Sequence, residues 1–282
     1  MRYGTGMLSP LELLSYYDVL DRPLTKDELG TDLQHPSVKQ REGYYYLFDR
    51  EYLVPLRKRR MEFASRKWRI VESVASWLRH LPFIRIVFVS GSLSMNNTDE
   101  VSDLDVIIVA KHGRIWITRL LVSGLLALLG RRRRHEDHTA PNKICPNHFI
   151  TDQALHIPFH SIYTAQLYAN LVPLVGDADL LARFQKENIW VEAYVAHWNM
   201  PKTRWHSSWL QKLLEKLMPF ANWLETITRN YQRARIVHRV SPLHPGGHVT
   251  YTDSALAFHA QSSEAEILQR YENSKSKFTH GL

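Results

Sequence analysis

The sequence predicts an α/β fold of the α+β type, in which helices pack against a small mixed sheet. Two apolar runs rich in β-branched residues, 84–89 and 106–109, have the length of buried strands. Amphipathic stretches of helical length precede and follow them. We expect a helix-and-hairpin module at 1–60, a core at 61–160 and a helical region at 161–282. A chain of 282 residues is long enough for about two domains.

Composition indicates a folded, basic protein without a disulfide framework. Hydrophobic residues make up 44% of the chain, which is enough for a sizeable core and excludes a largely disordered chain. The single cysteine, Cys145, excludes an internal disulfide, and the start of the chain lacks the apolar core of a signal peptide. We therefore expect a cytoplasmic protein. A net charge of +8 permits phosphate-rich partners such as nucleotides or nucleic acid, but it also fits an ordinary basic surface.

Two helix starts are visible in the first 60 residues. Ser9 is a typical N-cap, because proline follows it and the next ten residues have apolar positions near helical spacing. Thr25 and Glu28 have the spacing of a capping box, which predicts a short second helix.

A hairpin is expected to follow these helices. The segment 44–54, Y-Y-Y-L-F-D-R-E-Y-L-V, predicts two short strands that turn near Asp49. Helix, helix and hairpin in this order resemble a winged helix, which implies nucleic-acid binding. The alternative is a structural or substrate-side module, because the second helix carries more acidic than basic residues.

The segment 56–79 predicts a long basic helix that leads into the first core strand. It contains R-K-R-R-M-E-F-A-S-R-K-W-R. Its apolar positions have helical spacing: Phe63, Ile70, Val74 and Trp77. A solvated helix face is one interpretation of the arginines, and contact with phosphate groups is the other.

The stretch 85–109 is the most informative part of the chain, and its pattern is strand, tight turn, polar loop and strand. The first strand ends at Gly91-Ser92, where glycine lets the backbone approach a ligand closely. The second begins at Asp103 and Asp105, which should project side by side because residues two apart on a strand share a face. Two such carboxylates stay ionised together only with a cation or strong donors between them. Mg²⁺ suits this role, since it takes one or two carboxylates plus substrate phosphates; otherwise the aspartates only cap a loop.

Gly91-Ser92, ten intervening residues and the Asp103-x-Asp105 pair between apolar strands resemble the signature of the polymerase-beta-like nucleotidyltransferase superfamily. The resemblance implies a Mg²⁺-dependent enzyme that moves a nucleoside monophosphate from a nucleoside triphosphate to an acceptor hydroxyl. It leaves the acceptor open. Gly91 and Ser92 would bind the triphosphate. Asp103 and Asp105 would be the catalytic residues and would bind the metal, with two ions during turnover.

The third acidic residue of the superfamily pattern has no clear counterpart. It usually stands on a later strand, and the matching strand here is 143–150, K-I-C-P-N-H-F-I. Asn147 occupies the corresponding place and Asp152 follows just beyond the strand, so both are candidate replacements. Pro146 within this strand argues for a sheet edge or a bulge. The departure leaves an alternative function, a catalytically decayed core that acts as a nucleic-acid-binding or regulatory protein.

The segment 115–130 is apolar, but it is about 16 residues long and contains Arg119. We therefore expect a helix buried against the sheet and no membrane span. The run R-R-R-R-H-E-D-H that follows predicts an exposed turn, with contact to anionic lipid or phosphate as the alternative. Residues 135–138 have side chains that can bind metal, but neighbouring side chains point apart in regular structure, which favours a solvated loop.

From about residue 161 the sequence predicts helices. Two of them are separated by Pro173 and Gly176, a third runs from about 207 to 240, and a short one lies near the C-terminus. Their apolar stripes predict core packing. Such helices also resemble the region that follows the catalytic sheet in the superfamily and closes over the base and the acceptor.

Overall fold

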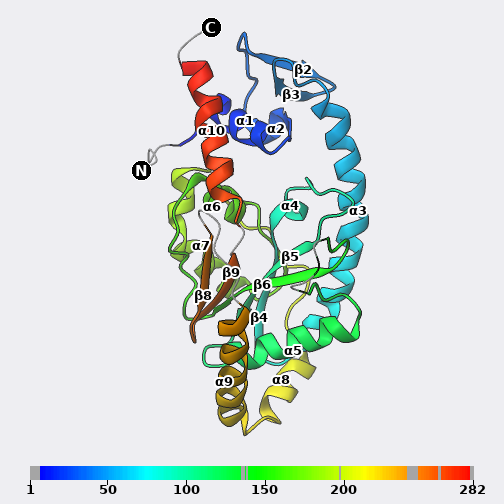
Figure 1. The fold of residues 1–282 in the computed structure, drawn as a ribbon, viewed down its shortest axis with the longest axis vertical. Helices are drawn as coiled ribbons and strands as arrows, with labels where there is room; N and C mark the ends of the chain where they lie inside the picture. Colours follow the sequence, from blue (N-terminus) through cyan, green and yellow to red (C-terminus); the bar gives the residue numbers. More distant parts are fainter. Residues whose placement is uncertain are drawn as a thin grey trace.

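The computed structural model describes residues 7–134, 137, 139–196, 198–239, 247–259 and 262–279. In these parts of the chain a mixed six-stranded sheet forms the centre and a three-stranded sheet lies near the N-terminus, with helices around both (Figure 1). The predicted α+β class is confirmed.

The first two helices begin where the sequence predicts. In α1 (Pro10–Val19) the Ser9 hydroxyl accepts from the amide three residues on, and the glutamate there accepts from the Ser9 amide. In α2 (Lys26–Leu29) Thr25 forms the same reciprocal capping box. At four residues α2 is about 6 Å long, which is too short to lie along a groove of nucleic acid.

The hairpin exists, but its predicted turn near Asp49 is wrong. The small sheet has the order β1-β3-β2 and consists of β1 (Leu24–Thr25), β2 (Val38–Arg41) and β3 (Tyr44–Leu47). Its two-residue turn is Glu42-Gly43, where both φ angles are positive at 53° and 80°. A positive φ at both central residues is the geometry that matches strand twist in a tight hairpin. Glutamate rarely adopts it, so the sequence hid this turn.

The basic run of 57–60 is largely occupied by contacts inside the protein. Arg57 is buried and donates to the carboxylate of Glu28 at 2.7 and 2.8 Å. Lys58 forms an ion pair with Glu42. Arg60 donates to the carbonyl oxygen of Asp21 at 3.0 Å. These contacts hold the N-terminal module against the helix that carries the run, which favours a structural role over contact with phosphate.

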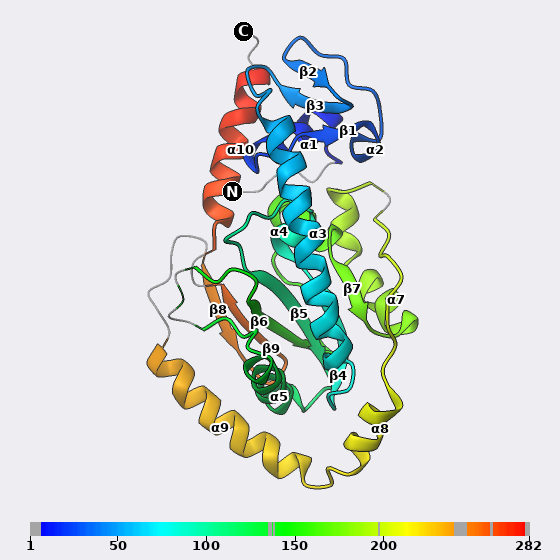
Figure 2. The ribbon, with the colours of Figure 1, turned by 90° about the vertical axis from the view of Figure 1, so that its right-hand side faces the viewer.

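That helix is α3 (Leu53–Leu78), which links the N-terminal module to the central sheet (Figure 2). Val74, one of its predicted apolar positions, is buried against the core. Trp77 is 57% exposed, so its predicted apolar position faces solvent. The buried face is shifted by one residue from the prediction, toward Ala75 and Leu78.

The central sheet has the strand order β7-β4-β5-β6-β9-β8. β5 and β6 are parallel, and every other neighbouring pair is antiparallel. Its strands are β4 (Ile84–Val89), β5 (Leu104–Ala110), β6 (Ile144–Thr151), β7 (Val172–Val175), β8 (His248–Tyr251) and β9 (Ala255–His259).

Pro146 lies in an interior strand, so the predicted sheet edge is wrong and the alternative, a bulge, is confirmed. The β5–β6 register shifts between the pairs Asp105–Cys145 and Ile107–His148. One extra residue therefore stands on β6 at this point. The bulge accommodates a residue that has no backbone N–H to donate.

Helices cover both faces of the central sheet (Figures 1 and 2). On one face α3 and α5 (Ile115–Leu128) pack on the buried side chains of β4 and β5. On the other face lie α1, α6 (Ile162–Ala169) and α7 (Ala178–Glu187). α5 is thus the predicted helix against the sheet. In the described residues no helix is long and apolar enough to cross a membrane.

The expectation of a wholly helical region after residue 161 is wrong, because β7, β8 and β9 lie there and complete the central sheet. These strands have only four or five residues, too few for their periodicity to stand out. The predicted helix at 207–240 is two helices with Pro219 between them. The remaining helical elements are η1 (Ile189–Ala193), α8 (Trp209–Lys216), α9 (Ala221–Arg239) and α10 (Glu264–Thr279).

Candidate functional site

The turn after β4 lies directly against the start of β5. The Ser90 amide donates to the carbonyl oxygen of Asp105 at 3.0 Å. Gly91 has a φ of +68°, and a Cβ atom there would lie 2.6 Å from Oδ2 of Asp105. Only glycine fits such an approach without a shift of its neighbour. The structure therefore brings the predicted glycine and the predicted carboxylate into contact; Ser92 follows in α4 (Gly91–Ser94).

Asp103 and Asp105 lie side by side, as predicted. One oxygen of each and the Sγ atom of Cys145 all lie within 4.8 Å of one another. Arg133 forms an ion pair with Asp103. Burial and the charge of Asp103 raise the pKa of Asp105 to about 7, although the Arg133 charge and a hydrogen bond from Asn147 act in the opposite direction. Ionisation of both carboxylates is therefore opposed near pH 7, and a further cation would relieve the repulsion between the two negative charges.

The donor set fits a hard divalent cation. Carboxylate oxygens are the ligands that Mg²⁺ prefers, and two of them leave room for water and phosphate. Cys145 is a softer ligand, and burial together with the two aspartates raises the pKa of its thiol well above the usual range. The thiol therefore stays protonated, and the two aspartates are the residues that would hold the ion.

The two candidates for the missing third carboxylate have different outcomes. Asn147 is at the site, where its side-chain amide donates to Oδ1 of Asp105 at 3.3 Å. Asp152 is not at the site, because its backbone amide donates to the carbonyl oxygen of Ala110 at the far end of β5. Ala110 is five residues from Asp105. At a strand rise of about 3.4 Å per residue, this is roughly 17 Å away. Its carboxylate accepts from the amide of His112 instead, at 2.8 Å. The suggestion that Asp152 reaches the site is wrong.

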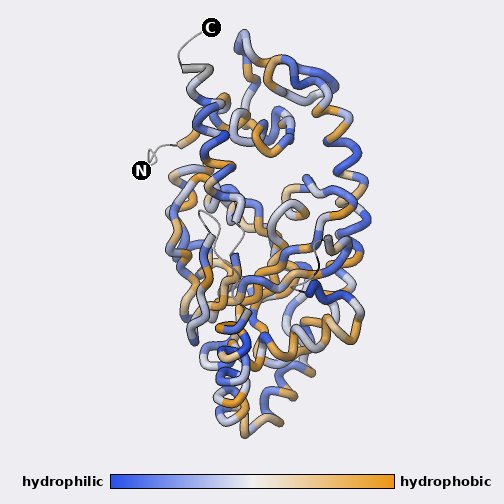
Figure 3. The backbone as a smooth tube through the Cα atoms, in the orientation of Figure 1, coloured by the Kyte–Doolittle hydropathy of each residue, from blue (hydrophilic) through white to orange (hydrophobic). Residues whose placement is uncertain are grey.

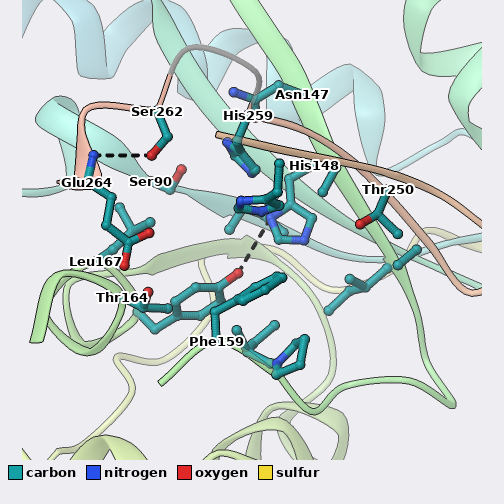
Figure 4. A pocket seen from close by; sticks show the side chains of 18 of the residues that line it. Ser90, Asn147, His148, Phe159, Thr164, Leu167, Thr250, His259, Ser262 and Glu264 are labelled. Atoms are coloured by element: carbon teal, nitrogen blue, oxygen red, sulfur yellow. Dashed lines mark hydrogen bonds between the residues drawn. The ribbon is translucent and has the colours of Figure 1, made fainter. Parts of the chain in front are cut away.

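A cavity of about 410 Å³ opens beside these residues, on the face of the sheet that α6 covers. Ser90, Gly91, Asp105 and Asn147 belong to its lining. The cavity continues along β6 and β9 and under the loop that contains Phe159, as the close-up shows (Figure 4). A volume of this size is typical of a small-molecule site.

Three histidines from different strands gather in the cavity. The ring of His259 lies 5.4 Å from that of His148 and 5.0 Å from that of His248, measured between centroids. Burial and the charge of neighbouring histidines lower the pKa of His148 to about 3 and that of His259 to about 4. Both rings are therefore neutral near pH 7, where they act as hydrogen-bonding groups and not as cations. The Tyr168 hydroxyl lies 3.4 Å from Nδ1 of His148.

A further carboxylate, Glu264, enters the cavity from the start of α10 (Figure 4). It accepts from the hydroxyl of Ser161 at 2.6 Å. Sequence reasoning missed Glu264, His248 and His259, because more than one hundred residues separate each of them from Asp105. It also missed His148, which directly follows Asn147. Every second residue of β8 and β9 lines the cavity. This alternation along the two strands was the sequence signal that could have indicated His248 and His259.

The metal-binding interpretation of 135–138 is not addressed by the structure, because of these four residues only Asp137 is described. Its carboxylate accepts from the amide of Arg134 at 2.9 Å, which is a turn contact. Within the described ranges, the group of Asp103, Asp105 and Cys145 is the one that could hold a metal ion.

Comparisons with known proteins do not assign a family. No family model matches the chain, and neither curated proteins nor solved structures give a significant match. The site therefore has to be interpreted from its own geometry.

Proposed function

We propose that the chain is a metal-dependent nucleotidyltransferase that moves a nucleoside monophosphate from a nucleoside triphosphate to an acceptor hydroxyl. The observation that carries this proposal is the close approach of Gly91 to Asp105 in the lining of a cavity. A turn that tolerates no side chain, paired carboxylates and a cavity of ligand size meet at one point. This combination is what binding of a metal-complexed phosphate chain beside an acceptor requires.

Each residue of the site has a separate task in the proposed reaction. Gly91 and Ser92 place their backbone against the phosphates, and Asp103 and Asp105 hold the divalent ion. Asn147 orients the Asp105 carboxylate through its hydrogen bond. When bound there, a divalent ion, proposed to be Mg²⁺, would supply positive charge against the negative charge of the phosphates. Two ions would act during turnover, as the resemblance to the superfamily implies.

The transfer itself is an in-line displacement. The acceptor oxygen forms a bond to the α-phosphorus, the bond from phosphorus to the pyrophosphate oxygen breaks, and pyrophosphate leaves with the electron pair. The hydroxyl proton passes to a base. Glu264 is the candidate for this role, because its carboxylate lines the same cavity as Asp105.

The cavity favours an acceptor without a high negative charge. His148 and His259 have lowered pKa values and are neutral near pH 7. Aliphatic and aromatic side chains form much of the wall, Ile107, Ile150 and Phe159 among them. Threonine and histidine side chains supply directional hydrogen bonds. A cytoplasmic location, where nucleoside triphosphates are abundant, belongs to the same proposal.

Calorimetry with the four nucleoside triphosphates in the presence of Mg²⁺ tests the proposal. We expect at least one triphosphate to bind. In the variant Asp103→Ala/Asp105→Ala, binding should weaken by more than about 100-fold, which is about 2.8 kcal/mol. Asp152→Ala is the matched control, since it removes a nearby carboxylate that does not reach the site. Production of pyrophosphate with an added acceptor pool then tests the transfer step.

Two results would overturn the proposal. One is the absence of binding to any triphosphate. The other is binding that survives the loss of both aspartates. Strong, salt-dependent binding to DNA or RNA without triphosphate binding would instead support a decayed core that acts as a nucleic-acid-binding or regulatory protein.

A further inference from the structure

Helices α8 and α9 expose a row of large apolar side chains to solvent. The exposed fraction is 75% for Trp209, 72% for Phe220 and 64% for Trp223. Trp209 and Leu213 lie four residues apart on α8, and Trp223 and Ile227 lie four residues apart on α9, the spacing that places two residues on one side of a helix. Leu217 and Phe220 lie in the segment that joins the two helices. We call this row the apolar ridge: Trp209, Leu213, Leu217, Phe220, Trp223 and Ile227.

The ridge is not needed to attach the two helices to the protein. Their inward faces combine apolar side chains, Ala221, Leu224 and Ile236, with polar ones. Gln211 donates to the carbonyl oxygen of Ile84, and Gln232 donates to that of Trp116 at 2.8 Å. Glu225 accepts from the amide of Trp116 at 3.0 Å. An ordinary surface helix turns its apolar side inward, whereas these helices turn large apolar side chains outward.

Positive charge flanks the ridge. Residues 209–239 include two acidic residues, and both face inward: Glu215 binds Arg85 at 2.8 Å, and Glu225 makes the contact described above. The exposed charges of the two helices are basic: Lys212, Lys216, Arg233 and Arg235.

An arginine of α5 lies between that helix and α9. Arg119 of α5 donates to Gln232 of α9 at 2.6 Å. Burial together with the neighbouring charges of Arg132 and Arg235 lowers the pKa of Arg119 to about 10.

The turn between α8 and α9 lies at one tip of the molecule, opposite the N-terminal module (Figures 1 and 2). The tube coloured by residue hydropathy has orange, hydrophobic positions at this tip (Figure 3). The tip can therefore approach an extended surface without interference from the rest of the protein.

We propose that α8 and α9 dock on an anionic lipid surface, with the apolar ridge inserted among the headgroups and the flanking lysines and arginines in contact with lipid phosphates. Tryptophan, phenylalanine and leucine beside basic residues are the composition of helices that lie in a membrane interface. Two copies of the chain would bring like charges together across the ridge. Nucleic acid would neutralise the charges but leave the leucine and isoleucine side chains without an apolar environment.

Co-sedimentation with lipid vesicles tests this proposal on the full chain. Vesicles contain phosphatidylcholine with about 30% phosphatidylserine, or phosphatidylcholine alone. We expect binding to the anionic vesicles to be at least about tenfold stronger, and to fall at least about tenfold in Leu217→Ser/Phe220→Ser/Trp223→Ser. The control Phe48→Ser/Tyr52→Ser removes exposed aromatic residues from the opposite end and should bind as the wild type does. Circular dichroism establishes that the variants are folded.

Charge reversal separates the electrostatic part of the interaction. Lys212→Glu/Lys216→Glu should abolish the preference for anionic vesicles. The control Arg66→Glu/Arg69→Glu changes the net charge by the same amount at exposed positions of α3. This control should retain the preference for anionic vesicles. The proposal is overturned by binding that ignores phosphatidylserine, by equal losses in the control variants, by ridge-dependent dimers that form without lipid, or by a DNA duplex that binds in preference to vesicles.

Discussion

Replacement of Gly91 by alanine is the sharpest test of the contact between the turn and Asp105. The new Cβ atom would meet Oδ2 of Asp105 at 2.6 Å, a distance that requires one of the two to move. Asp105 has little freedom to move, because the Asn147 side-chain amide donates to its carboxylate. The backbone carbonyl oxygen of Asp105 also accepts from the Ser90 amide. We therefore expect Gly91→Ala to destabilise the protein and to displace the proposed metal ligand.

Two effects contribute to the expected free-energy change. Alanine at a φ of +68° costs about 1 to 2 kcal/mol, because its Cβ crowds the backbone in the left-handed region. The contact with Asp105 adds about 1 to 3 kcal/mol, the usual cost of an extra group in a packed site. The free energy of unfolding should fall by about 2 to 5 kcal/mol in total.

Gly113→Ala isolates the second effect. Gly113 has nearly the same φ, +67°, but a Cβ atom there has nothing within 4 Å. Both substitutions restrict the unfolded chain equally, so this entropy change cancels in the comparison. Urea denaturation at pH 7 should show that Gly91→Ala costs at least about 1 kcal/mol more than Gly113→Ala.

A double-mutant cycle identifies the source of the difference. Removal of the carboxylate in Asp105→Ala should relieve the crowding, so the double variant should lose less stability than the sum of the single variants. Equal costs for Gly91→Ala and Gly113→Ala, or strict additivity with Asp105→Ala, would refute the reasoning from close approach.

Three further predictions concern pH and the excluded carboxylate. The folded pKa of Asp105, about 7, lies above its ordinary value of 3.8, so the stability its protonated form contributes is lost as pH rises from about 4 to 7. In metal-free buffer Asp105→Asn should therefore gain up to about 4 kcal/mol over the wild type at pH 8 and little at pH 4, measured by urea denaturation. His148 has a lowered folded pKa, so its contribution is present above pH 6.5 and is lost as pH falls toward 3. In thermal melts between pH 7 and 4, His148→Gln should remove this acid-induced loss of stability, which is on the order of 3 to 5 kcal/mol in the wild type. An unchanged dependence of stability on pH would contradict the lowered pKa of His148. Asp152→Ala should lower stability, because it removes the oxygen that accepts from the amide of His112, and should leave triphosphate affinity within about twofold in calorimetry. A larger loss of affinity would contradict the placement of Asp152 outside the site.

The features that depend on nearby residues agree with the sequence-based predictions. The capping boxes at Ser9 and Thr25 need only residues three apart, and both form. The strands β4 and β5 follow from apolar runs bounded by polar turns, and they pair with each other. Antiparallel pairing of consecutive strands places the end of the first beside the start of the second. For this reason Gly91 and Asp105 could be assigned to one site before their contact was seen.

Features that join distant segments were not predictable in the same way. β7, β8 and β9 are too short for their periodicity to be distinguished from that of helix ends or loops, and their place in the sheet depends on free edges of β4 and β6. The position of Asp152 depended on the parallel β5–β6 register, which puts it at the wrong end of the sheet. The outward orientation of the apolar ridge also differs from the core packing that its helical spacing predicts.

Periodicity, caps and turn residues act over a few positions, so the amino-acid sequence is sufficient to place the turn at Gly91 and the paired aspartates. The cavity is different, because it requires His148, His259 and Glu264 to come together from three separate elements. Long-range burial brings these elements together, and the hydrophobic effect that drives burial is non-directional. An apolar pattern indicates that a segment is buried, but it does not indicate which other segment it packs against. Strand pairing and helix packing in the folded chain determine that partner.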